Sequence, residues 1–426
     1  MRTSAIFGAL LLAAASVHAQ TTAEVYRQQD SAAAAARKAK DWPAYRDRVA
    51  LLDSILGHHP NVRVVNARIH AHLGDTAAAY RSLRDFAAMG LVRKIDADSE
   101  LVSLHGAPAW DEIAAKIAAN ANARGTFTRA FAMPDSDFIA EDITFDPGGN
   151  RWLVSGIRRS VIASVSRDGQ VSTFIEGPDK GHGFLALAVD SARGVLWATT
   201  EAIPQSIGFD TTMTGRASLF RFDLKSAKLL QRYDMPSSEA HGAGDIAVAD
   251  NGDLFISDTG TGAIWVIRHG GVLQQLVAPG EIMSPQGPAI ARDGKTFYVS
   301  DYLRGIARID RVSGKVSWVK HDATIATNGI DGLSVLDGRT LVAVQNGTNP
   351  NRVVRLALDP SGSVITRYEV IAQDGETIRE PTHGVFAGRD YYFIANGGYG
   401  SFGDDGNLVK GERAIAPVVM KIARLR

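Results

Sequence analysis

Residues that carry carboxylate, amide or imidazole groups recur at a long interval in the C-terminal two thirds of this 426-residue sequence. Most stand at the start of a strand-like apolar run or at the end of the run that follows it. Those at the starts are Glu141, Asp142, Asp245, Gln286, Asp331 and His383, and those at the ends are Asp258, Asp301, Asn346 and Asn396. If these positions converge, several carboxylates must share a small space.

Carboxylates that converge repel one another, so either some of them are protonated or a cation lies among them. Carboxylate and amide oxygens suit calcium and magnesium, which are hard divalent cations. A bound divalent ion can polarise a carbonyl group, and a free carboxylate beside it can act as a base. The pattern therefore predicts a metal-assisted hydrolytic site. Asp258 and Asp301 are the exceptions, because an aspartate after a strand commonly accepts hydrogen bonds from turn amides.

The elements that position these residues are predicted from the periodicity. After Gly125, apolar and polar residues alternate with period two, and tight-turn dipeptides such as Asn251-Gly252 and Asp293-Gly294 separate the runs. One equivalent position recurs at intervals of 44, 59, 42, 45 and 52 residues, at Glu141, Leu185, Gly244, Gln286, Asp331 and His383. Such periods predict a mainly β fold with a six-bladed β-propeller over residues 125–426.

Closure of the ring is also predicted. The sixth unit supplies only three strands before the chain ends. Residues 127–134 (FTRAFAMP) resemble the outer strand of a blade whose other strands do not adjoin it in the sequence. Adding this strand to the sixth blade would close the ring and cover an open sheet edge. The inner-strand starts and second-strand ends would then surround one mouth of the channel. The long insertion at residues 201–216 is expected to form a lid there, and Gly397–Gly400 is expected only to turn the chain.

The preceding segment, residues 20–122, is predicted to be helical. It is rich in alanine, and Val49, Leu52 and Leu56 share one helical face. Asp41 and Asp75 are 34 residues apart, which is the period of tetratricopeptide helix pairs. The segment resembles one and a half to two degenerate repeats of that family. Two roles remain open, namely a peptide groove for a protein partner and a helical cap on the propeller.

Composition and the N-terminus indicate where the protein works. Arg2, a short apolar run and the small-residue site Val17-His18-Ala19 predict a signal peptide over residues 1–19, hence a periplasmic or secreted protein. The 46 basic residues balance the 46 acidic ones, so neither nucleic acid nor an anionic membrane is an expected partner. No other segment is apolar enough to span a membrane. Cysteine is absent, which excludes disulfides and thiolate chemistry.

The predicted propeller resembles the gluconolactonase and senescence-marker-protein family of six-bladed lactonases. The resemblance is strongest in GIDGL, GRTLVAVQNG and RVVRLALDPSG of the fifth unit. It implies a divalent metal, usually calcium, held by Glu141, Gln286 and Asp331, with Asp331 also acting as the base. The family has asparagine at the Gln286 position, and its substrate-contacting arginine and asparagine correspond to Gly242 and Gly244 here. The implied activity is hydrolysis of a lactone or ester.

Two alternatives remain. Histidine–glycine pairs precede three strand starts, at His182, His241 and His383. They resemble the mouth histidine of the streptogramin-linearising lyases, which implies that His383 is a catalytic base. A propeller can also bind a small molecule or a protein without any chemistry, because a fold does not fix a function.

Overall fold

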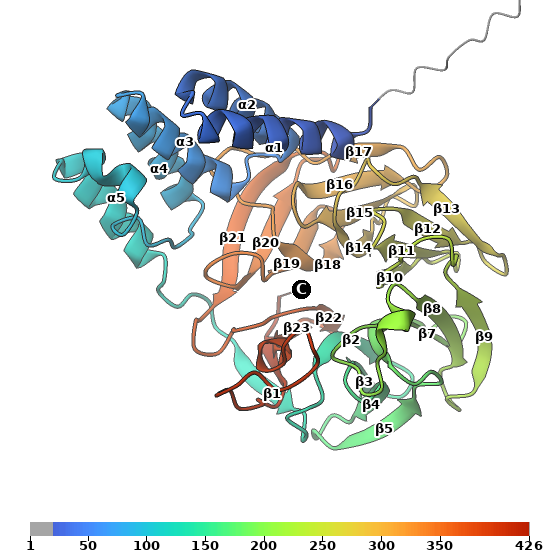
Figure 1. Cartoon of the computed structure of the whole chain (residues 1–426). Coiled ribbons are helices and arrows are strands. Elements are labelled where there is room, and N and C mark those ends of the chain that lie inside the picture. The colour runs from blue at the N-terminus through green and yellow to red at the C-terminus, as the bar shows by residue number, and fades with distance from the viewer. Residues whose placement is uncertain (1–19, 426) are drawn as a thin grey trace, which may run out of the picture.

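The computed structural model describes residues 20–425, and the predicted signal peptide lies outside this range. Six four-stranded antiparallel sheets are arranged as blades in a ring, which confirms the predicted six-bladed β-propeller (Figure 1). Helices precede the ring at the N-terminal side of the chain. No helix within residues 20–425 has the length and apolar character of a membrane span.

Each of the first five blades is a meander of four consecutive strands, with the first strand innermost. The first blade comprises β2 (Ala140–Asp146), β3 (Arg151–Gly156), β4 (Val161–Val165) and β5 (Val171–Glu176), and the second comprises β6 (His182–Asp190), β7 (Val195–Ala202), β8 (Ala217–Asp223) and β9 (Leu229–Asp234). The third comprises β10 (Ala243–Val248), β11 (Leu254–Asp258), β12 (Ile264–Ile267) and β13 (Leu273–Val277). The fourth comprises β14 (Pro285–Ile290), β15 (Thr296–Asp301), β16 (Gly305–Asp310) and β17 (Val316–Trp318), and the fifth comprises β18 (Ile330–Asp337), β19 (Thr340–Gln345), β20 (Arg352–Leu358) and β21 (Ile365–Gln373).

The sixth blade closes the ring as predicted. Its three C-terminal strands are β22 (Gly384–Ala387), β23 (Asp390–Asn396) and β24 (Val418–Ile422), and β1 (Thr128–Ala132) pairs with β24 as the outer strand. Trp152 of the first blade packs against Phe131 and Tyr392 of the sixth, with ring centroids 5.4 and 4.7 Å away. Both ends of the propeller are therefore held in one sheet, and the seam with the first blade is an aromatic cluster.

The helices form antiparallel pairs, in the order α1 (Thr22–Lys38), α2 (Trp42–Ile55), α3 (Pro60–His72) and α4 (Thr76–Ala88), followed by a 3-10 helix (Ser99–Leu104) and α5 (Pro108–Ala119). The 34-residue repeat has a physical basis in their caps. Asp41 accepts a hydrogen bond from the Ala44 amide, and Asp75 accepts one from the Ala78 amide, each at 3.0 Å. Each aspartate therefore begins the second helix of a pair. Membership in the tetratricopeptide family stays a prediction.

The helical layer is docked on the mouth face of the ring, over the fourth and fifth blades. The ends of inner and second strands identify this face, and the loops there contact the helices. The Val92 amide donates to the Asn349 carbonyl at 2.7 Å, and Asn328 Nδ2 donates to the Leu56 carbonyl at 3.1 Å. Figure 1 shows the helices gathered beside the blades that contain β16 to β21. The cap interpretation therefore has a structural basis, and it places the cap beside the channel opening.

Arg352 is the central contact of this docking. Its side chain is fully buried, and its NH1 group donates to the Met89 and Gly90 carbonyls at 3.0 and 3.3 Å. These carbonyls lie at the C-terminus of α4, where the helix dipole is negative and favours a cation. Nε of the same side chain donates to Gln345 Oε1 at 2.7 Å. One guanidinium group thus joins the helical layer to the fifth blade.

Arg352→Met removes this connection while keeping an apolar stem of similar length. The variant leaves buried carbonyl groups without donors, so we expect the free energy of unfolding to fall by about 2–4 kcal/mol. Urea denaturation measures the change, and limited proteolysis should cleave the helical segment earlier. The matched control is Arg355→Met on the same strand, which removes a partly exposed ion pair with Glu369 and should cost less than about 1 kcal/mol. Equal losses in the two variants would contradict the assigned role.

Candidate functional site

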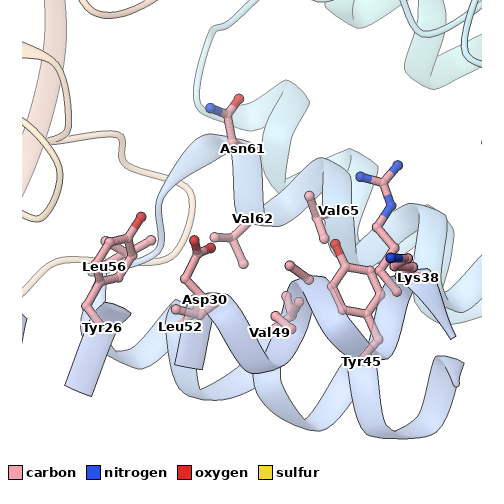
Figure 2. Close-up of a pocket in the computed structure, with 13 residues that line it drawn as sticks. Tyr26, Asp30, Lys38, Tyr45, Val49, Leu52, Leu56, Asn61, Val62 and Val65 are labelled. Atoms are coloured by element: carbon pink, nitrogen blue, oxygen red, sulfur yellow. The ribbon is translucent and has the colours of Figure 1, made fainter. Parts of the chain in front are cut away.

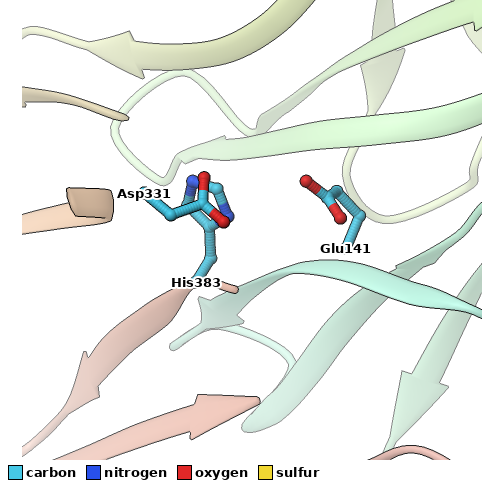
Figure 3. Close-up of side chains that lie close together, drawn as sticks. All are labelled: Glu141, Asp331 and His383. Atoms are coloured by element: carbon cyan, nitrogen blue, oxygen red, sulfur yellow. The ribbon is translucent and has the colours of Figure 1, made fainter. Parts of the chain in front are cut away.

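Three of the predicted site residues meet at the mouth of the channel. Glu141 is the second residue of β2, Asp331 is the second residue of β18, and His383 directly precedes β22. These strands belong to the first, fifth and sixth blades, which are consecutive around the closed ring. The ligand atoms of the three side chains all lie within 4.8 Å of one another. Figure 3 shows Asp331 and His383 together, with the Glu141 carboxylate turned toward them.

The imidazole of His383 is paired with a carboxylate from the opposite side of the ring. Its Nε2 lies 2.6 Å from Oδ1 of Asp245, which belongs to β10 of the third blade. This is an ion-pair distance, although the N–H direction is not that of a hydrogen bond, since both ring nitrogens are buried without a hydrogen-bond partner. Because Nε2 faces Asp245, Nδ1 is the nitrogen left for a ligand.

A chain of hydrogen bonds orients Asp331. Asn346 Nδ2 donates to Asp331 Oδ2 at 2.6 Å, and the Tyr302 hydroxyl donates to Asn346 Oδ1 at 2.9 Å. The amide of Asn346 is therefore fixed with its nitrogen toward the carboxylate. Burial, followed by repulsion from Asp331, raises the pKa of Tyr302 to about 12, so its hydroxyl stays protonated as the donor. One Asp331 oxygen thus has a fixed partner.

Glu141 has a tyrosine partner that the sequence did not reveal. The Tyr399 hydroxyl is hydrogen-bonded to the Glu141 carboxylate, while Oε2 of Glu141 is buried without a partner. Tyr399 belongs to the segment Gly397–Gly400, which we expected only to turn the chain, so that expectation was incomplete. Gly398 has φ = 88°, a left-handed conformation that glycine permits, and it turns the segment toward the mouth. An aromatic residue between glycines at the predicted mouth was the available signal.

Electrostatics in this cluster are dominated by carboxylates in a low-dielectric space. Burial and then repulsion from Asp331 raise the pKa of Glu141 to about 8, and burial with repulsion from Asp245 raises the pKa of Asp331 to about 7. Burial alone would lower the pKa of His383. The carboxylates of Asp245, Asp142 and Asp331 together outweigh burial and raise the pKa of His383 well above its usual value. The metal-free site thus holds protons where a cation could replace them.

Asp142, next to Glu141, has a structural role. Its Oδ1 accepts from the Ile143 amide and its Oδ2 accepts from the Leu187 amide, both at 2.6 Å. Leu187 lies in the innermost strand of the second blade, so this carboxylate joins two blades. Burial raises the pKa of Asp142 to about 6, although these backbone donors oppose the shift. It contributes negative charge to the mouth while both of its oxygens are already bonded.

The predicted structural role of the two serine–aspartate pairs is confirmed. Asp258 accepts from the backbone amides of Gly242 and Gly260 at 3.0 and 3.2 Å, and Asp301 accepts from those of Met283 and Leu303 at 2.8 and 2.9 Å. His241 Nδ1 also lies 2.6 Å from Asp258 Oδ2. Of the three histidine–glycine pairs, only the one at His383 contributes to the cluster of potential metal ligands among the described residues.

Gln286 remains the least defined of the predicted ligands. It lies in β14 of the fourth blade and is partly buried. Its Nε2 makes a long, 3.4 Å hydrogen bond with Ser284 Oγ, and its carbonyl oxygen on the backbone accepts from Ser257 Oγ at 2.7 Å. Its role as a ligand stays a prediction, and His383 occupies the third place in the observed cluster.

The second blade supplies an acidic residue that sequence reasoning missed. Glu201, near the end of β7, is partly buried, and burial with repulsion from Asp258 raises its pKa to about 7. The insertion that follows it is fastened to the first blade, since the Ile207 amide donates to the Arg158 carbonyl at 2.8 Å. Glutamate at a second-strand end, the position of Asp258 and Asp301, was the signal. The lid function of this insertion stays a prediction.

The two glycines that replace the family's polar residues have a steric explanation. A Cβ atom at Gly244 would lie 2.7 Å from Thr259 Cγ2, and one at Gly242 would collide with Thr259 Oγ1. A side chain at either position would therefore require Thr259, in the turn after β11, to move. At these two positions the third blade lacks the polar side chains that the resemblance implied, while its Asp245 supplies a carboxylate to the mouth.

A separate groove lies within the helical layer. It has a volume of about 580 Å³ and is lined by α1, α2 and α3, with Val49 and Leu52 on one side and Val62 and Val65 on the other (Figure 2). Arg37 and Lys38 also line it. A protein partner at this groove stays a prediction.

Comparisons with known proteins were made for both sequence and structure. The sequence matches no family model, and no curated protein is significantly similar to it. Similar solved structures include a gluconolactonase from Xanthomonas campestris (15% identity, 71% of this chain and 89% of that chain, TM-score 0.46) and virginiamycin B lyase from Staphylococcus aureus (17%, 63% and 81%, 0.45). A glucose dehydrogenase is similar at 14% identity, over 70% and 99% of the two chains, with a TM-score of 0.48. These likenesses concern the propeller fold alone and say nothing of which residues act at the mouth.

The raised pKa values predict how the stability of the metal-free protein depends on pH. The folded-state pKa of Glu141 is above its unfolded value, so its contribution to stability is present below about pH 4.5 and is lost as pH rises through about 8. Glu141→Gln removes this titration. We therefore expect the variant to match the parent near pH 5 and to be more stable than it near pH 9, in urea denaturation with a chelator. A variant that is less stable at the higher pH would contradict the proposed charge repulsion.

Proposed function

We propose that this protein is a divalent-metal-dependent hydrolase of the lactonase type that acts at the mouth of the propeller. The observation that carries the proposal is the convergence of Glu141, Asp331 and His383, whose ligand atoms lie within 4.8 Å of one another. Glu141 Oε2 and both ring nitrogens of His383 are buried without a hydrogen-bond partner. Because Nε2 lies against Asp245, the two atoms open to a ligand are Glu141 Oε2 and His383 Nδ1. A shared cation would give both atoms a partner and would relieve the repulsion between the carboxylates.

The side chains present fit such an ion. Two carboxylates and one imidazole would supply three protein ligands and leave an open position for water or substrate. Asp245 beside His383 Nε2 corresponds to the carboxylate that usually orients a metal-binding histidine. Because one donor is a nitrogen, the set favours zinc or manganese over calcium, which takes oxygen ligands. An all-oxygen set with Gln286 in place of His383 would favour calcium instead.

The residues of the mouth have separable roles in this proposal. The bound cation would polarise the substrate carbonyl and acidify a water molecule. Asp331 accepts a proton from that water, and Asn346 and Tyr302 hold its carboxylate in one orientation. Glu141, supported by Tyr399, and His383, supported by Asp245, provide the remaining negative charge and nitrogen donor. Hydrolysis would open the lactone ring, and the product would leave as a hydroxy acid.

The histidine-based lyase is less well supported by the same geometry. A general base must be unprotonated, whereas the surrounding carboxylates keep the pKa of His383 well above its usual value. In the metal-free site His383 is therefore an acid at neutral pH. The two mechanisms differ in what they require, since a lyase needs His383 and can tolerate the loss of the Asp331 charge.

Metal content tests the first part of the proposal. Purified protein should hold one divalent ion per chain by elemental analysis, and zinc or manganese should raise the melting temperature of chelator-treated protein more than calcium does. Glu141→Gln and His383→Gln should abolish this shift, while Gln286→Ala should retain it. A calcium-specific shift that is lost in Gln286→Ala but kept in His383→Gln would show that the ligands are all oxygen atoms, with Gln286 in place of His383. Absence of any stoichiometric ion, together with no change in melting temperature on adding metal, would contradict the proposed metal site.

Hydrolysis of a lactone and ester panel tests the second part. We expect Asp331→Asn to lower kcat/KM by about 10²–10⁴-fold, because the amide cannot accept the proton. Asp337→Asn is the matched control, since Asp337 ends the same strand, is exposed and bonds only the turn amide of Arg339. It should retain parental activity. Full activity in Asp331→Asn together with inactivity in His383→Gln would favour the lyase instead.

A further inference from the structure

A cavity lies between the helical layer and the propeller, and none of the roles above uses it. Its volume is about 430 Å³, within the range of about 300–1,000 Å³ that is usual for small-molecule sites. The helical layer contributes Asn61, Phe86, Leu91 and Arg93 to its wall. The propeller contributes Asn328 and the loop 346–349 between β19 and β20. The cavity therefore exists only because the two parts of the chain are docked together.

The cavity begins where the proposed active site ends. Asn346 lines the cavity, and its Nδ2 also donates to Asp331 Oδ2 at 2.6 Å. A single side chain thus contacts both spaces. The two spaces are therefore adjacent at Asn346.

The wall of the cavity carries amide and hydroxyl groups but no carboxylate. Four asparagines, Asn61, Asn328, Asn346 and Asn349, and the hydroxyl of Thr348 line it. Amides both donate and accept hydrogen bonds, as the hydroxyl groups of a ligand also do. The apolar surfaces of Phe86 and Leu91 complete a lining that suits a ligand with both polar edges and apolar faces.

Arg93 and His59 are the two side chains of the wall that can carry a charge. Arg93 is the only lysine or arginine that lines the cavity, and its NH1 group already donates to Asn61 Oδ1 at 3.0 Å. Burial lowers the pKa of His59 to about 4, although Asp53 opposes the shift, so this imidazole is neutral at pH 7. The wall thus carries a single positive charge, that of Arg93, beside a mouth that is strongly acidic.

Asn328 supplies the second, independent observation. It is 2% exposed, and its Nδ2 donates to the Leu56 carbonyl at 3.1 Å and to the Leu303 carbonyl. Two carbonyl acceptors fix the orientation of the amide, because the opposite orientation would place oxygen against oxygen. Its Oδ1 is consequently a buried acceptor without a partner. Such an atom needs a donor, which a hydroxyl group provides and an anion does not.

We infer that the interdomain cavity binds an uncharged, polyhydroxylated extension of the substrate, namely a further sugar unit attached to the ring that is opened at Asp331. This inference rests on the proposed lactonase function and names its substrate class as lactones of oligosaccharide acids. Most polar contacts in the cavity come from the propeller residues Asn328, Asn346, Thr348 and Asn349, and the helical layer adds Asn61.

Two lactones that share the reacting ring test the inference. Cellobiono-1,5-lactone carries one neutral hexose more than glucono-1,5-lactone, and we expect its kcat/KM to be at least about tenfold higher. Thr348→Trp fills the cavity from its partly exposed loop and should reduce this ratio to about one. Thr366→Trp is the control, because Thr366 is exposed on the outer strand β21 and, like Thr348, donates one hydrogen bond to a backbone carbonyl. It should keep the parental ratio. Equal kcat/KM values for the two lactones in the parent would overturn the inference.

Equilibrium binding separates this inference from the proposed function. Calorimetry with cellobiose, which has no lactone bond, should show binding to the parent and to Thr366→Trp, and weaker binding to Thr348→Trp and to Asn61→Ala. The second variant removes one amide from an exposed helical position without adding bulk, so it remains informative if Thr348→Trp misfolds. Cellobiose binding without hydrolysis of either lactone would support sugar binding in the cavity and would contradict the proposed hydrolase function. Hydrolysis without cellobiose binding, or tighter binding of glucose 6-phosphate than of cellobiose, would overturn the inference.

Discussion

The accumulation of buried carboxylates at one mouth of the propeller is the constraint on which the site depends. Glu141, Asp245 and Asp331 come from three different blades and face a single imidazole, that of His383. Without another cation, the folded protein must hold protons on groups that would lose them in water, and the raised pKa values of Glu141 and Asp331 express this. The arrangement opposes stability in the metal-free protein at neutral pH, which is the pattern of a site built for a ligand.

The ring can hold such a cluster because its stability comes from elsewhere. The outer strand β1 closes the sixth blade, and aromatic packing around Trp152 joins that blade to the first. Other acidic residues that face the mouth have structural roles. Asp142 joins the first and second blades through backbone amides, and Asp301 holds a turn of the fourth. Carboxylates at the mouth therefore have either a structural role or a role in the proposed site. The structural ones are those whose oxygens already accept hydrogen bonds from backbone amides.

The helical layer and the mouth form one functional unit in this interpretation. Arg352 fixes the C-terminus of α4 over the fifth blade, and this docking creates the cavity that meets the site at Asn346. The third blade has Gly242 and Gly244 beside its mouth carboxylate Asp245, whereas the cavity beneath the helices is lined by amides from both the propeller and α3. In this proposal the ring and the helical layer share the polar recognition of the substrate, while the groups proposed for chemistry lie on the blades.

The propeller, its six blades and its closure could be predicted from the amino-acid sequence, because the period-two alternation and the turn dipeptides are local properties repeated at a fixed interval. The same periodicity placed Glu141, Asp331 and His383 at equivalent strand starts, so their meeting at one mouth could be expected. Three features became evident from the folded structure: His383 completes the cluster, Tyr399 supports Glu141, and the helices cover the mouth face. Those facts depend on the direction of side chains across a channel and on contacts between residues more than 200 positions apart, such as Arg352 and Met89, and no local pattern encodes them.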